Sequence, residues 1–92
     1  MYSYYLSIEA EEDVVRIFEY GFNHFGLKQA EKYYDELFEC FNKIAFNPYM
    51  FPKYPYHNEN YRYCVCGVDT IYYTIVNDQV KIITIIGKQD YW

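Results

Sequence analysis

The spacing of hydrophobic residues along this chain changes from that of a strand to that of helices, and then back to that of strands. Residues 4–6, Tyr-Tyr-Leu, indicate a short strand. Ser7, followed by four acidic residues at positions 9 to 13, is typical of a capped helix start. From there a buried helical stripe is predicted as far as about Phe25, with apolar or small residues at the i, i+3, i+4 positions: Val14, Ile17, Phe18, Gly21, Phe22 and Phe25.

A second helix is predicted to follow the first one almost at once. Gly26 can adopt the left-handed conformation that closes a helix. Helical spacing then resumes at Lys28 and continues to about Phe46, and Asn47-Pro48 ends it because a residue before proline avoids helical dihedrals. So short a connector implies an antiparallel helical hairpin, which needs a sheet to cover its apolar faces.

The last part of the chain predicts a loop and three strands. Pro48, Pro52 and Pro55 alternate with aromatic residues, and we expect this segment to pack across an edge of the sheet. The strands are predicted at 61–66, 70–76 and 80–86, with connectors short enough for an antiparallel meander. We therefore expect one α+β domain over residues 1–92, ordered β-α-α-β-β-β, with an antiparallel sheet packed against an N-terminal helical hairpin.

The final strand carries apolar residues on both of its alternating sets. Val80, Ile82 and Ile86 belong to one set, and Ile83 and Ile85 belong to the other. Such a strand is buried on both faces or hides its outer face under a partner. With the exposed Tyr/Phe loop, this pattern predicts a surface that another protein covers.

Charge limits the classes of function. The formal net charge is −5, and the first 47 residues hold nine acids and four bases, so the remainder is neutral. Free-standing nucleic-acid binders need clustered Lys and Arg, so we expect no direct nucleic-acid binding. Any anionic target would have to meet the C-terminal half.

Neither a membrane span nor a metal centre is predicted. The chain has no apolar stretch of about 20 residues and no signal peptide, so we expect a cytoplasmic protein without a membrane partner. Three cysteines do not make a disulfide framework, and Cys64 and Cys66 at strand spacing are expected to be packed thiols. His24 and His57 lack ligand-spaced partners, so no metal and no cofactor is expected.

The order of elements and several local segments together resemble the RelE/ParE superfamily, and its ParE branch in particular, from about Leu6 to Asp90. The segments that carry the resemblance are 6–13 at the first helix start, Gly21 to Tyr33 in the hairpin, 44–48 at the end of the second helix, Tyr61-Arg62, and 80–90 in the last strand and tail. The resemblance implies a toxin of a type II toxin–antitoxin pair, neutralised by a ParD-like antitoxin.

Two mechanisms follow from this resemblance. ParE-like toxins poison DNA gyrase by binding, whereas RelE-like toxins are ribosome-dependent mRNA endonucleases. Here Ile86 stands where family members often have histidine, and Lys88-Gln89 stands where many have two arginines, which disfavours RNA cleavage. RNA cleavage needs a convergent acid–base set, and the sequence suggests none, so we expect a gyrase inhibitor and not an enzyme. The alternatives are the mRNA endonuclease and a non-toxic binding domain.

Candidate binding residues fall into two groups. Those for the target, DNA gyrase, are two basic and two aromatic residues of the C-terminal half: Arg62, Lys88, Tyr91 and Trp92. Those for the antitoxin are the apolar residues of the first helix, the loop and the strands: Val14, Phe18, Tyr49, Phe51, Tyr54, Tyr61, Tyr63, Ile83 and Ile85. An antitoxin segment would fold on binding, laying a helix in a hydrophobic groove.

Overall fold

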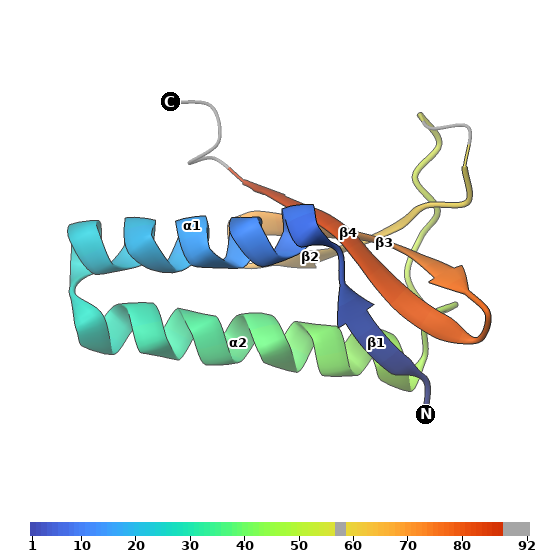
Figure 1. Cartoon of the computed structure of the whole chain (residues 1–92), viewed down its shortest axis with the longest axis horizontal. Helices are drawn as coiled ribbons and strands as arrows, with labels where there is room; N and C mark the ends of the chain where they lie inside the picture. Colours follow the sequence, from blue (N-terminus) through green and yellow to red (C-terminus); the bar gives the residue numbers. More distant parts are fainter. Residues whose placement is uncertain (57–58, 88–92) are drawn as a thin grey trace.

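A computed structural model describes residues 1–56 and 59–87 of the chain. Its elements follow the predicted order: β1 (Ser3–Leu6), α1 (Ile8–Phe25), α2 (Leu27–Phe46), β2 (Arg62–Cys66), β3 (Asp69–Val76) and β4 (Gln79–Gly87). Figure 1 shows the two helices side by side as an antiparallel hairpin, whose turn lies at the end of the molecule remote from the N-terminus. Gly26 forms that turn with a φ of 89°, a value that glycine adopts readily.

The four strands form one sheet in the order β1-β4-β3-β2. β2, β3 and β4 are the predicted antiparallel meander. β1 pairs with β4 in parallel, from Ser3 opposite Gln79 to Leu6 opposite Ile82, so the sheet is mixed and not wholly antiparallel. A parallel neighbour requires a long connection, which the helical hairpin and the rest of the chain supply.

The core lies between the helical hairpin and one face of this sheet. Its members are fully or nearly fully buried: Ala10, Val14, Ile17, Leu37, Phe41, Ile44, Cys64, Cys66, Ile71, Tyr73, Val80, Ile82 and Ile85. The predicted stripe of the first helix is only partly covered, because Phe22 and Phe25 near the hairpin turn remain 49% and 67% exposed. The hydrophobic spacing thus extends past the part of the helix that the sheet covers.

A β-bulge in β4 explains why both alternating sets of this strand are apolar. Tyr72 lies opposite Thr84 and Tyr73 lies opposite Ile82, so Ile83 has no residue opposite it. The extra residue shifts the alternation of side chains by one position. As a result Ile82 and Ile85, from different sets, are both buried under the helices.

The start of α1 holds the backbone of this bulge. Ser7 caps the helix by accepting a hydrogen bond from the Ala10 N–H (3.0 Å), and its hydroxyl also donates to the Ile83 carbonyl oxygen (2.7 Å). Asp13 Oδ2 accepts hydrogen bonds from the Ile85 N–H and the Thr84 hydroxyl, both at 2.9 Å. From the sequence pattern alone, the acidic residues at the helix start are expected to interact with the helix dipole and to be solvated. Asp13 instead makes tertiary contacts with the sheet.

We expect Asp13→Asn to lower the free energy of unfolding by about 1–3 kcal/mol. The Asp13 carboxylate accepts from Ile85 and Thr84 with Oδ2 and from Arg16 with Oδ1 at 2.7 Å. The amide has one acceptor oxygen and no charge, so it cannot keep all three contacts. Urea denaturation followed by circular dichroism measures the change. Glu12→Gln is the matched control, because Glu12 is the exposed neighbour, and its effect should stay within about 0.5 kcal/mol. Equal effects of the two substitutions would contradict the role of Asp13.

Candidate functional site

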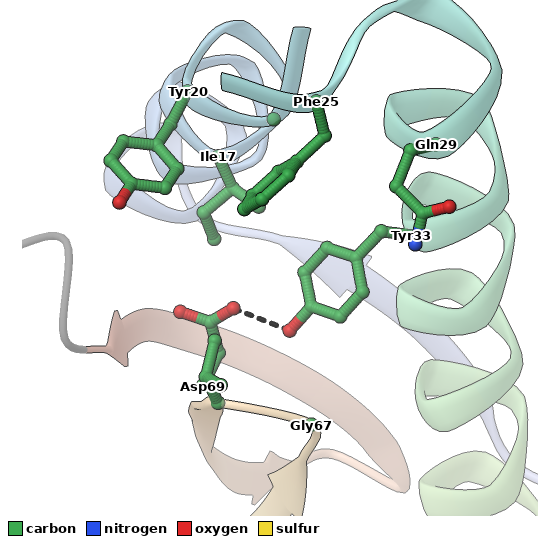
Figure 2. Close-up of a pocket in the computed structure, with 9 residues that line it drawn as sticks. Ile17, Tyr20, Phe25, Gln29, Tyr33, Gly67 and Asp69 are labelled. Atoms are coloured by element: carbon green, nitrogen blue, oxygen red, sulfur yellow. Dashed lines mark hydrogen bonds between the residues drawn. The ribbon is translucent and has the colours of Figure 1, made fainter. Parts of the chain in front are cut away.

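An apolar cavity lies between the turn end of the helical hairpin and the turn that joins β2 to β3 (Figure 2). It has a volume of about 230 Å³, and its walls are mainly apolar and aromatic: Ile17, Tyr20, Gly21 and Phe25 from α1, Gln29 and Tyr33 from α2, and Gly67, Val68 and Asp69 from the strand turn. Phe25 and Val68 at its rim are 67% and 62% exposed. Sequence reasoning did not find this cavity, because its residues come from three segments.

A phenol and a carboxylate meet at one wall of the cavity. The Tyr33 hydroxyl donates to Asp69 Oδ2 and also lies 2.8 Å from the Cys66 carbonyl oxygen, as Figure 2 shows for the first contact. The Asp69 side chain is fully buried. The sequence predicts residues 67–69 as a hairpin connector, and nothing in their residue types indicates that Asp69 is buried.

Gly67 allows Tyr33 to reach these acceptors. Its φ is +60°, and a Cβ built at this position would lie 3.0 Å from the Tyr33 ring. A larger residue would therefore be strained and would also crowd the ring. The tight turn and the phenol contact thus depend on the same glycine.

The pair has the chemistry of a structural contact. Burial raises the pKa of the Tyr33 phenol well above its usual range, and the neighbouring Asp69 carboxylate raises it further. The phenol therefore stays protonated at neutral pH and acts as a hydrogen-bond donor, not as a base. It ties α2 to the turn between β2 and β3.

A second candidate surface is the outer face of the sheet together with the proline-containing loop. The loop runs along the edge of β2 as predicted, with hydrogen bonds from the Tyr54 N–H to the Tyr61 carbonyl oxygen (2.8 Å) and from the Tyr63 N–H to the Pro52 carbonyl oxygen (3.1 Å). The Tyr54 ring then lies against Tyr63 and Tyr72, with centroids 6.3 and 5.2 Å away. We call Tyr54, Tyr56, Tyr63 and Tyr72 the outer tyrosine cluster.

Arg62 connects the loop to β2. Its Nη1 donates to the Phe51 carbonyl oxygen at 2.7 Å and to the Tyr49 carbonyl oxygen at 3.3 Å, and its guanidinium lies over the Tyr49 ring at 5.3 Å. The side chain also lines a hollow of about 240 Å³ with Lys53, Asn60 and Thr74. From the sequence, Arg62 could pair with an acid or contact the target, and the observed partners are carbonyl groups and an aromatic ring.

The comparisons with known proteins agree with this architecture. A family model described as the ParE toxin of the type II toxin–antitoxin system parDE matches residues 4–91. The chain belongs to the ParE toxin family. Among solved structures, a chain described as the chromosomal ParDE TA system from P. aeruginosa matches with a TM-score of 0.82 and 15% identity, covering 95% of this chain and 96% of that one. At such identity the likeness shows the fold alone, and a search of curated proteins gave no match.

The ParE-type fold separates the predicted antitoxin contacts into accessible and inaccessible residues. Val14 and Ile85 are 8% and 0% exposed, so a partner could not reach them without opening the core. Tyr49 is 57% exposed. The remaining candidates are partly buried: Phe18, Phe51, Tyr54, Tyr61, Tyr63 and Ile83. These residues do not share one surface, because Phe18 lies in the helical hairpin and Phe51 packs against the core. Tyr54 and Tyr63 belong to the outer tyrosine cluster, and Tyr49 lies beside Tyr2.

The predicted target contacts are less fully described. Arg62 lies at the start of β2, whereas Lys88, Tyr91 and Trp92 lie outside the described residues, as does His57. Within residues 1–56 and 59–87, no group of three or more His, Cys, Asp or Glu side chains could hold a metal ion. Neither of the described helices is long and apolar enough to cross a membrane.

We expect Tyr33→Phe to lower the free energy of unfolding by about 1–3 kcal/mol, because it removes a hydrogen bond from the fully buried Asp69 carboxylate. Urea denaturation measures the change. Tyr34→Phe is the control, since Tyr34 is the adjacent residue and is 41% exposed, and we expect a change within about 0.5 kcal/mol. If both variants are as stable as the parent, the contact between Tyr33 and Asp69 does not hold the strand turn.

Proposed function

We propose that this ParE-family chain inhibits DNA gyrase by binding it, and that a ParD-like antitoxin neutralises it. The observation that carries the proposal is the family match over residues 4–91. The solved structure with the same fold is described as a ParDE system, and this supports an antitoxin partner for the present chain. Inhibition by binding requires a complementary surface and no catalytic groups.

The chemistry of the sheet half favours binding over RNA cleavage. Its described basic residues are Lys53, Arg62 and Lys81, and the Arg62 guanidinium is engaged by loop carbonyl groups. Cleavage through the RNA 2′-hydroxyl needs a base, cations around the phosphorus and a donor to the leaving oxygen. The hollow beside Arg62 offers Lys53 and Arg62 as cations but contains no carboxylate or histidine among its lining residues.

The gyrase proposal is tested by incubating the purified toxin with gyrase and supercoiled DNA, with a coupled translation reaction beside it. We expect gyrase–DNA breaks to accumulate while the mRNA stays intact. Ribosome-dependent mRNA cuts with unaffected gyrase would establish the endonuclease instead. Silence in both assays, with antitoxin binding retained, would support a non-toxic binding domain.

Substitutions at the candidate target residues extend this test. Lys88→Ala and Trp92→Ala should each reduce gyrase breaks several-fold without changing the melting temperature, and Tyr91→Ala should do so if the whole tail contacts the target. At Arg62 the pair Arg62→Lys and Arg62→Ala separates two roles. If Arg62 contacts the target through its positive charge, Arg62→Lys retains the contact and Arg62→Ala loses it. If Arg62 instead holds the loop in place, which needs the several donors of the guanidinium, both variants lose that function.

The outer tyrosine cluster and the loop are the surface that we assign to the antitoxin. Tyr49, Met50 and Tyr56 expose 57%, 61% and 83% of their surface. Large exposed aromatic residues are common at the energetic centre of protein interfaces. An amphipathic antitoxin segment could bury them, and the acidic helical hairpin would attract basic residues elsewhere on the same partner.

We expect Tyr54→Ser to weaken binding of the ParD-like antitoxin tenfold or more, because Tyr54 is the ring on which the outer tyrosine cluster is assembled. Isothermal titration calorimetry measures the affinity, and thermal unfolding checks that the variant is folded. Tyr20→Ser on α1 is the control and should bind within about threefold of the parent. A larger loss of antitoxin affinity for Tyr20→Ser than for Tyr54→Ser would indicate that the antitoxin binds the helical hairpin instead.

A further inference from the structure

Three thiols gather where α2 crosses β2. Cys40 is half-buried on α2, and Cys64 and Cys66 are buried on β2. The two strand cysteines are two residues apart, so both side chains point to the helical face of the sheet. Their burial agrees with the sequence interpretation of packed thiols, but sequence reasoning did not single out Cys40.

Cys40 and Cys66 are placed to react with each other. Their Sγ atoms are 2.7 Å apart, whereas the sulfur atoms of a disulfide are about 2.05 Å apart. Less than an ångström of movement would bring them to bonding distance. Cys64 differs, since its thiol lies 3.8 Å from the carbonyl oxygen of Val65 next to it.

The backbone around Cys66 is held against one face of α2. The Tyr33 hydroxyl lies 2.8 Å from the Cys66 carbonyl oxygen, and the Cys66 thiol lies 3.8 Å from the Glu36 carbonyl oxygen. Residues 33, 36 and 40 follow one another along a single helical face. The contact between Cys66 and Cys40 therefore follows from the way β2 packs on α2.

We propose that Cys40 and Cys66 are a redox-modification site that forms an intramolecular disulfide by exchange with a low-molecular-weight disulfide such as oxidised glutathione. The Cys40 thiolate attacks one sulfur of the glutathione disulfide, breaks its S–S bond and releases one glutathione thiolate. Cys66 then loses its proton and attacks the Cys40 sulfur, releasing the second glutathione. Two protein thiols are oxidised, and one glutathione disulfide is reduced to two thiols.

The order of attack follows from accessibility. Cys40 is the more exposed of the two residues, being half-buried, whereas Cys66 is 5% exposed. Burial also raises the pKa of the Cys66 thiol above its usual range, so its reaction needs the high local concentration that an adjacent mixed disulfide provides. The exchange should therefore become faster as the pH rises above neutrality.

The disulfide would raise the stability of the domain against unfolding. It would join α2 to β2 and close a loop from residue 40 to residue 66, which contains the whole proline-containing segment. Closing such a loop restricts the unfolded chain and raises the melting temperature by roughly 10 °C for a domain of this size. The reaction of the two thiols does not depend on which target the toxin binds.

The test is to incubate the folded, reduced chain with oxidised glutathione, quench with acid, unfold it, and count free thiols by maleimide labelling and mass spectrometry. We expect the parent to fall from three free thiols to one, with a peptide link between residues 40 and 66 and no glutathione attached. The oxidised form should melt roughly 10 °C higher, and a reductant should reverse both changes.

Single serine variants decide which sulfurs react. Cys64→Ser is the matched control, and it should lose both of its remaining thiols and gain the same thermal stability. Cys66→Ser should stop at a glutathione adduct on Cys40, and Cys40→Ser should keep both thiols. Four outcomes would each overturn the proposal. They are three free thiols in the parent after oxidation, a disulfide that includes Cys64, a disulfide between two molecules, and a glutathione adduct on the parent that does not resolve.

Discussion

The β-bulge at Ile83 is the constraint on which the rest of the domain depends. Without the extra residue, Ile82 and Ile85 would face opposite sides of β4, and one of them would leave the core. The bulge persists because Ser7 and Asp13, at the start of α1, bind the backbone and the Thr84 hydroxyl beside it. One short segment thus sets the register of the central strand and the position of the first helix together.

A second set of contacts fixes the other half of the sheet through one face of α2. Tyr33 reaches Asp69 and the Cys66 carbonyl group, and Cys40 meets the Cys66 thiol further along the same helix. The proline-containing loop lies along the edge of β2, where the Tyr54 ring packs against Tyr63 and Tyr72. The helical side of the molecule provides stability, and the loop side displays the aromatic surface that a partner would cover.

Most of the fold, but little of the site, could be predicted from the sequence. Helical spacing, Gly26 and Pro48 located both helices, and alternation located the meander, because these signals are local. The parallel pairing of β1 with β4 joins segments more than seventy residues apart, and no local pattern encodes it. Among the candidate antitoxin residues, Val14 and Ile85 have the same apolar character as the accessible ones, and only the packing separates them.

The sequence by itself determined the family, the order of elements and the acidic character of the hairpin, since each rests on residue type and spacing along the chain. The tertiary structure decided which apolar residues are core, which acids are structural and which thiols meet. Asp13, Asp69 and Cys40 acquire their roles from groups on distant segments. Such roles depend on distances in space, which the spacing of residues along one chain does not specify.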